Sequence, residues 1–257
     1  MRVQIEEAQV KIDLRDAREN IAAFNKSAAY LAGDWLMHEF FGQFRDGRQK
    51  QPACVCAVLV DALWNTRVDA EPGTKQREPY EKPMNHICCD IEANGKRLRR
   101  LSLDLGREAL LRFPERVAEV AGESLELVGI AEGAARRNYS FATKFLHWLA
   151  PANFPVVDSR ARKSINRLLS GQGQNCPGSF VTGQARSCVV SDYRRWIWFY
   201  HHLVAAATDD GWGLRLVAHD YDSQAGGPVG QRQNTLLRVL DKHFWMAASP
   251  RAEAHVE

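Results

Sequence analysis

The chain has 257 residues, of which 45% are apolar and 25% charged, close to the averages for soluble globular proteins. Its 34 Lys and Arg residues slightly outnumber 31 Asp and Glu residues, and the formal net charge of +3 neither requires nor excludes a polyanionic partner. The longest uncharged apolar run, 53–60, is too short to cross a bilayer, and segment 1–7 is polar and acidic. We therefore expect no membrane segment, no secretory signal and a cytoplasmic location.

The chain contains 6 cysteines, and nothing in their spacing marks an exported disulfide framework, so we expect free thiols. The nearest approach to a metal-binding pattern is His86, Cys88 and Cys89. Adjacent cysteines rarely both bind one zinc ion, and a CxxC pair is missing. The sequence therefore predicts no metal site and no cofactor.

The first predicted elements are helical. Residues 13–48 place Leu31, Trp35, Phe40 and Phe44 near helical spacing with charges between them. Pro52 then precedes an apolar segment, 53–68, which has the composition of a buried helix.

The next stretch is mixed. Residues 69–86 contain prolines, a glycine and many charges, which favour a long loop. Segment 87–105 allows two interpretations, a small β hairpin that turns at Ala-Asn-Gly (93–95) or a helix, and both stay open. Residues 106–121 are again predicted to be helical despite Pro114.

Residues 140–170 carry the clearest local pattern. Ser140 is a plausible N-cap for a helix over 141–149, and Asp158 for a second helix over 159–169 that ends at Gly171. The second helix has an apolar stripe and, on another face, a basic stripe formed by Arg160, Lys163 and Arg167. Two such helices, with exposed amides and cations, are suited to bind a DNA backbone.

The remaining elements are predicted from composition. Residues 171–190 are expected to form a loop and 192–207 an aromatic-rich helix. Residues 211–228 are expected to be loop-like, 234–247 to form an amphipathic helix, and the tail 249–257 to be disordered.

Residues 134–169 resemble the core of the helix-hairpin-helix DNA glycosylases. In that family a buried helix is followed by a Pro-Val-Asp entry into a helix beginning Asp-Thr-His-Val-x-Arg, and here 155–163 reads Pro-Val-Val-Asp-Ser-Arg-Ala-Arg-Lys. Matching the aspartates implies that Asp158 is the catalytic carboxylate. The helix end at 59–66 is similar to the family's helix that inserts a polar residue into DNA, which implies that Asn65, with Trp64 beside it, contacts DNA.

The chain also departs from the family. The Gly-x-Gly turn of the hairpin is replaced by Arg-Arg-Asn-Tyr-Ser at 136–140, and the cysteine spacing of the iron–sulfur members is absent. The lysine of bifunctional members falls on Ser140. Lys144 follows one helical turn later, and we expect it to contact phosphate or solvent rather than to replace that lysine.

The resemblance implies a set of site residues around Asp158. Those implied to bind DNA are Asn65, Trp64, Arg136, Arg137, Ser140, Lys144, Arg160, Lys163 and Arg167. Tyr139, Phe141 and Trp148 are candidates to line a base pocket, although three core aromatics are the stronger interpretation.

The resemblance implies a mainly α-helical, two-lobed fold over 1–248, with one lobe containing 53–133 and the other 13–48 and 134–248. It also implies a monofunctional glycosylase acting on double-stranded DNA, without an obligate protein partner. The base would leave the stack, and the carboxylate would stabilise an oxocarbenium-like transition state.

The base itself is open: it is either a damaged or mispaired base, or a modified base of foreign phage-type DNA attacked in antiviral defence. Two alternatives stay open for the whole chain. One is a non-catalytic DNA-binding or interaction module of the same architecture, and the other is a helical protein that never meets DNA.

Overall fold

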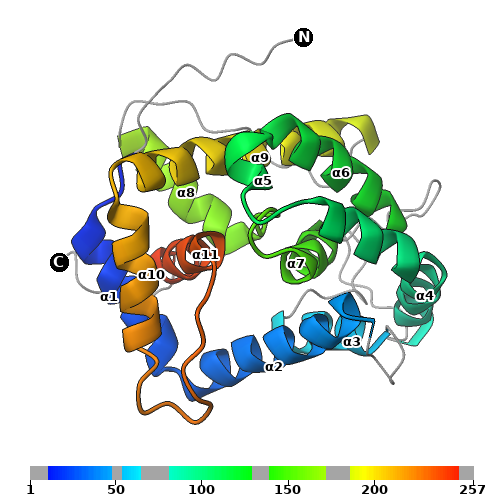
Figure 1. Cartoon of the computed structure of the whole chain (residues 1–257), viewed down its shortest axis with the longest axis horizontal. Helices are drawn as coiled ribbons and strands as arrows, with labels where there is room; N and C mark the ends of the chain where they lie inside the picture. Colours follow the sequence, from blue (N-terminus) through cyan, green and yellow to red (C-terminus); the bar gives the residue numbers. More distant parts are fainter. Residues whose placement is uncertain (1–10, 48–53, 65–80, 129–138, 172–185, 249–257) are drawn as a thin grey trace.

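The computed structural model describes residues 11–47, 54–64, 81–128, 139–171 and 186–248. Within these ranges the chain is helical and forms no strand, which confirms the mainly α prediction (Figure 1). The helices are α1 (Leu14–Lys26), α2 (Ala28–Arg45), α3 (Cys54–Trp64), α4 (Glu81–Asp104), α5 (Ala109–Arg112), α6 (Pro114–Leu127), α7 (Tyr139–Leu149), α8 (Ser159–Gly171), α9 (Arg186–Asp209), α10 (Trp212–Asp222) and α11 (Leu236–Ala247).

Helix α7 occupies the middle of the molecule, with α2 along one side and α9 along the other (Figure 1). It contacts α2, α3 and α6, whereas α11 contacts α1, α8, α9 and α10. Buried apolar residues of all these helices form one contiguous core. In the described part of the chain, no helix combines the length and apolarity needed to span a membrane. The division into two lobes stays a prediction.

The link between α7 and α8 is held by buried hydrogen bonds. Residues 141–150 are buried throughout, which places α7 inside the core. The hydroxyl of Thr143 accepts a hydrogen bond from the backbone N–H of Val157 (3.2 Å) and donates one to the carbonyl oxygen of Val157 (3.3 Å). Tyr193 of α9 donates to the carbonyl of Pro155 (2.9 Å). The extended segment that precedes α8 is therefore fixed from two sides.

The predicted beginning of α8 is confirmed. The carboxylate of Asp158 accepts a hydrogen bond from the backbone N–H of Ala161 at 2.8 Å, as an N-cap does. The helix includes Gly171, two residues beyond the predicted range 159–169, and the described residues end there. Ser140, in contrast, is not an N-cap: α7 begins at Tyr139, and Ser140 lies in its first turn.

The hairpin interpretation of 87–105 is wrong, because α4 runs through the whole segment. Its buried residues Met84, Ile87, Ile91 and Leu98 recur at helical spacing and join the core. Gly95 lies mid-helix, where a Cβ would be 3.7 Å from the ring of Phe44, an ordinary van der Waals distance. Packing of α4 against the core thus accompanies a helix in a sequence that would also suit a turn.

Other boundaries differ from the prediction for local reasons. Segment 13–48 contains two helices, because Ser27 has an extended backbone: its N–H donates to the carbonyl of Phe24 at the end of α1, and its hydroxyl accepts from the N–H of Tyr30 at the start of α2. Pro114 begins α6 at a position where its missing N–H costs nothing. The predicted loop 211–228 contains α10, whose residues Trp212, Leu216 and Asp220 are buried on one face. Helices α4 and α9 begin inside the predicted loops 69–86 and 171–190.

Candidate functional site

Asp158 and Lys144 form an ion pair at the junction of α7 and α8. The ammonium nitrogen of Lys144 lies 3.7 Å from a carboxylate oxygen of Asp158, and their side chains are 4% and 9% exposed. The same ammonium group donates to the hydroxyl of Ser140 (3.0 Å) and to the carbonyl of Trp64 (3.3 Å). The expectation that Lys144 contacts phosphate or solvent is therefore wrong, since α7 directs it into the interior.

Burial makes Lys144 a weaker base than an exposed lysine. Desolvation lowers the pKa of Lys144, and the negative charges of Asp158 and Asp241 offset part of that change. A lowered pKa makes the Lys144 ammonium group a stronger acid than that of an exposed lysine. The pair thus places a carboxylate and this ammonium group in one low-dielectric position.

Trp64, the last residue of α3, joins this pair to a second buried cation. The ammonium nitrogen of Lys144 lies 5.8 Å from the centre of a ring of Trp64, and the guanidinium carbon of Arg238 lies 4.6 Å from it. Arg238 belongs to α11 and is fully buried. Cations near the face of an indole are attracted by its quadrupole. Trp64 is therefore a shared contact of the two cations.

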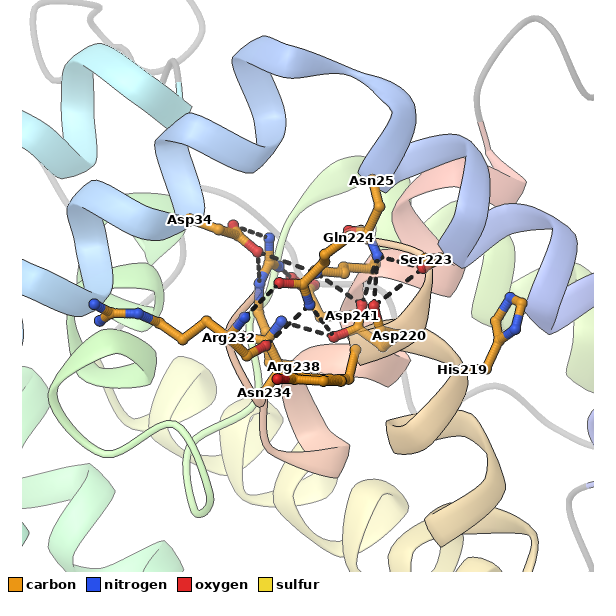
Figure 2. Close-up of polar contacts among 12 residues, drawn as sticks. Asn25, Asp34, His219, Asp220, Ser223, Gln224, Arg232, Asn234, Arg238 and Asp241 are labelled. Atoms are coloured by element: carbon orange, nitrogen blue, oxygen red, sulfur yellow. Dashed lines mark hydrogen bonds and ion pairs between the residues drawn. The ribbon is translucent and has the colours of Figure 1, made fainter. Parts of the chain in front are cut away.

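Arg238 begins a network of buried charges (Figure 2). It donates to Asp34 of α2 at 2.6 Å and also pairs with Asp241 of α11. Lys242 lies 3.3 Å from Asp34 and 2.8 Å from Asp220 of α10. Burial alone would raise the pKa of Asp34, but Arg238 and Lys242 outweigh it and hold the pKa low. The network connects three helices through the interior.

Neutral polar groups complete the hydrogen bonding of Asp220. Its carboxylate accepts from Asn25 (3.0 Å), Gln224 (3.0 Å) and Asn234 (2.8 Å). These partners come from α1 and from the segment between α10 and α11, and Figure 2 shows them converging on Asp220. A buried charge is tolerated only with such partners, so Asp220 joins these elements.

An aromatic pocket lies beside the ion pair. Its walls come from α1, α2, α3 and α11, and it encloses about 130 Å³. The lining residues are Phe24, Ala29, Tyr30, Gly33, Asp34, Leu63, Trp64 and Trp245. Tyr30 and Leu63 are 39% and 41% exposed, so the rim reaches the surface. A Cβ at Gly33 would meet no heavy atom within 4 Å, which leaves part of the space open.

Two contacts connect this pocket to Asp158. Lys144, the ion-pair partner of Asp158, donates to the carbonyl of the wall residue Trp64. Arg160, two residues after Asp158, stacks on the opposite wall, with its guanidinium carbon 4.2 Å from the ring centre of Trp245. Asp158 does not itself line the pocket.

The structure places the other predicted residues in several environments. Phe141 and Trp148 are each 1% exposed and belong to the core, so the base-pocket assignment of these two residues is wrong. Lys163 and Arg167 are exposed on α8. Asn65, Arg136 and Arg137 lie outside the described residues, as does the tail 249–257, and the side chain of Tyr139 is not described.

Sequence reasoning missed Asp34, Arg238, Asp241, Lys242 and Trp245. Arg238, Asp241 and Lys242 lie three and then one residue apart, so they share the polar face of an amphipathic helix, which periodicity alone assigns to solvent. The structure buries that face, and its charges find partners inside the protein. Spacing along the chain could not identify Asp34 or Asp220 as those partners.

The structure describes the side chains of four of the six cysteines. Cys54, Cys56, Cys88 and Cys89 are free thiols, and burial, followed by the influence of Cys54, raises the pKa of Cys88 to about 12. A search of the described residues found no group of three or more His, Cys, Asp or Glu side chains arranged to hold a metal ion.

Comparisons with known proteins identified no relative of this chain. No protein-family model matches the chain, and neither the curated proteins nor the solved structures gave a match. The function must therefore be argued from the ion pair, the pocket and the resemblance of residues 134–169.

Proposed function

We propose that this protein is a DNA glycosylase and that Asp158 is its catalytic carboxylate. The observation that carries the proposal is the position of Asp158: it caps α8, its side chain is almost fully buried, and its ion-pair partner Lys144 donates to Trp64 in the wall of an aromatic pocket. The family resemblance of residues 134–169 assigns the same role to this residue. The substrate would be double-stranded DNA in the cytoplasm.

The chemistry requires one well-placed negative charge. Breaking the bond between C1′ and the base leaves a positively charged sugar, and a nearby carboxylate stabilises it and orients the attacking water. The bonding electrons leave with the base, and water supplies the new oxygen at C1′. Lys144 keeps a positive charge beside the Asp158 carboxylate until substrate arrives. No metal or cofactor is needed for this step.

The aromatic pocket would receive the flipped base. Trp64 and Trp245 contribute large flat rings, and stacking on such rings accepts any base. Leaving the helix costs a few kcal/mol, least for a mispaired or damaged base. The open space beside Gly33 would then hold part of the base.

The DNA backbone would lie along the exposed face of α8. Lys163 and Arg167 are exposed there, and Arg160 is exposed beside the pocket. Such contacts position a duplex without reading its sequence. The repair of a damaged or mispaired base and the attack on a modified phage base are both compatible with this arrangement.

Base release from defined duplexes tests the proposal. Duplexes with mispaired, oxidised, alkylated, hydroxymethylated or glucosylated bases are incubated with the protein, and alkali then cleaves any abasic site. Asp158→Asn should lower the rate at least ~100-fold, the scale for removing one transition-state charge contact. Asp13→Asn is a matched control, because Asp13 caps α1 in the same way through the N–H groups of Arg15 and Asp16.

Each result has a defined meaning. Base release that Asp158→Asn abolishes and Asp13→Asn preserves supports the proposal, and the preferred duplex separates repair from defence. Equal rates for wild type and Asp158→Asn would refute the assignment of Asp158. Salt-dependent DNA binding without release from any duplex would instead support the non-catalytic DNA-binding module.

The position of Lys144 favours a second candidate activity, strand cleavage after base removal. Its ammonium nitrogen lies 3.0 Å from the hydroxyl of Ser140, the position where the resemblance places the amine of bifunctional members. A neutral amine would attack C1′ of the abasic sugar and lose water to form a Schiff base. Borohydride would then reduce it to a stable protein–DNA adduct. Lys144→Gln should abolish this adduct, and its absence in wild type would restrict the enzyme to base release.

A further inference from the structure

The buried charges around the ion pair do not balance. Four aspartates (Asp34, Asp158, Asp220 and Asp241) face three cations (Lys144, Arg238 and Lys242) in the described interior. Each side chain is between 0% and 9% exposed. An unbalanced charge in a low-dielectric interior is costly, so such a cluster tends to keep a proton.

Asp241 is the carboxylate least satisfied by its surroundings. One oxygen pairs with Arg238, but the other, Oδ1, is buried and has no hydrogen-bond partner in the described interior. Asp34 and Asp220, in contrast, each pair with two cations or amides, and Asp158 caps a helix. A protonated acid at Asp241 would remove the cost of an unpartnered anionic oxygen.

We propose that Asp241 holds the proton that balances this cluster, and that its ionisation controls how firmly Lys144 is kept as an ammonium ion. This inference deepens the proposed function and rests on it for its catalytic consequence. Asp241 acts through Lys144 and is therefore a positioning residue, since nothing places it against the substrate.

The groups that face Asp241 come from several elements. Burial raises the pKa of Asp241 to about 7. The cations Arg238, on the same helix, and Lys144 of α7 lower this pKa, whereas the negative charges of Asp158 and of Asp34 on α2 raise it. The hydroxyl of Tyr200 on α9 is also buried and lacks a hydrogen-bond partner among the described residues. Burial raises the pKa of Tyr200, and the charge of Asp241 raises it further, so Tyr200 stays neutral.

Nearby histidines do not replace Asp241 as the site of the proton. Burial lowers the pKa of His147 to about 3, and the charge of Arg238 contributes to this. Burial also lowers the pKa of His38, despite its hydrogen bond with Asn234. Both rings are neutral near pH 7, which leaves Asp241 as the titrating group beside Lys144.

The consequence has a definite direction. Below about pH 7 Asp241 is neutral, and Asp158 is the main partner of the Lys144 ammonium, with a smaller contribution from the charge of Asp61 on α3. Above it, the carboxylate of Asp241 adds a further negative charge and raises the pKa of Lys144. Lys144 then loses its proton at a higher pH than it would with Asp158 alone. Ionised Asp241 therefore keeps Lys144 in the ammonium form further into alkaline solution.

Nuclear magnetic resonance titration of the full-length protein tests this without DNA. The carboxyl carbon of Asp241 should titrate near pH 7 in wild type, and the side-chain nitrogen of Lys144 should titrate about one unit lower in Asp241→Asn, a tenfold change in the proton equilibrium. The control is Asp104→Asn, because Asp104 is an exposed residue paired with Arg100 on α4, and it should leave Lys144 unchanged.

A midpoint near pH 4 for Asp241 in wild type would overturn the proposal, as would an unchanged Lys144 in a folded variant. The wild-type titration shows whether Asp241 holds the proton even if Asp241→Asn does not fold. Borohydride trapping on abasic DNA across pH 6–9 then examines the catalytic consequence, where Asp241→Asn should shift the rise in trapping about one unit lower. Normal titrations without trapping would refute the amine chemistry and leave the role of Asp241 intact.

Discussion

The ammonium nitrogen of Lys144 lies 3.7 Å from the carboxylate of Asp158, and both side chains are almost fully buried. Lys144 comes from the middle of the central helix α7, and Asp158 from the turn before α8. Two opposite charges removed from water depend on each other, because either one alone would be left without a counter-ion. This dependence connects the stability of the fold to the candidate chemistry.

A double-mutant cycle measures that dependence. Lys144→Met should lower the free energy of unfolding by about 3–5 kcal/mol at pH 7, since it leaves a buried carboxylate unpaired. The double variant Lys144→Met/Asp158→Asn should cost less than the sum of the single variants, by about 1–3 kcal/mol. Urea denaturation gives these values. Additive losses would mean that the two charges do not interact.

Substitutions at Gly33 separate stability from pocket function. Gly33→Ala should raise the free energy of unfolding by about 1 kcal/mol, because alanine favours a helix and the added Cβ meets no neighbour. Gly33→Leu would place a side chain in the cavity and should lower base release at least ~10-fold while the protein stays folded. Thermal melts and the release assay make the comparison. Unchanged release by Gly33→Leu would show that the cavity does not receive the base.

Stability should depend on pH through Asp241. Its folded pKa of about 7 lies above the ordinary 3.8, so the folded state holds an extra proton between these values. Its contribution to stability is therefore lost as the pH rises from about 4 to 7, by an amount on the order of 4 kcal/mol. The difference in free energy of unfolding between wild type and Asp241→Asn should change by that order across the window, as measured by urea denaturation. A constant difference would contradict it.

His147 and His243 should act in the opposite direction. Burial lowers their pKa values to about 3 and about 4, below the ordinary 6.5. The unfolded state thus binds more protons, and stability is lost as the pH falls below about 6.5. His243→Gln should reduce this acid sensitivity, because it removes one of the two buried rings. An acid profile of His243→Gln identical to that of the wild type would exclude this explanation.

Two glycines near α10 offer a packing test. A Cβ at Gly227 would lie 2.4 Å from a methyl carbon of Leu31 and 3.1 Å from the carbonyl oxygen of Gln224, whereas one at Gly230 would meet nothing within 4 Å. Gly227→Ala should cost about 1–3 kcal/mol of stability, and Gly230→Ala less than about 0.5 kcal/mol. Thermal denaturation compares the two variants. Equal melting temperatures would show that the segment around Gly227 shifts to accommodate the added methyl group.

Local chemistry explains why parts of the fold were predictable. The N-cap at Asp158 depends on a few neighbouring residues, and the structure confirms it. Segment 87–105 was ambiguous because Asn94-Gly95 suits a turn as well as a helix. The packing of Gly95 beside Phe44, which is distant in sequence, accompanies the helix there.

The sequence by itself determined that Asp158 begins a helix with a basic face, because capping and periodicity act over a few residues. Only the tertiary structure decided where Lys144 points and which charges meet. Arg238 pairs with Asp34 across most of the chain, and Trp64 and Trp245 line one pocket from separate helices. Spacing along a helix separates its apolar and polar faces. Whether a polar face is buried, and which charges it meets there, depends on how distant helices pack.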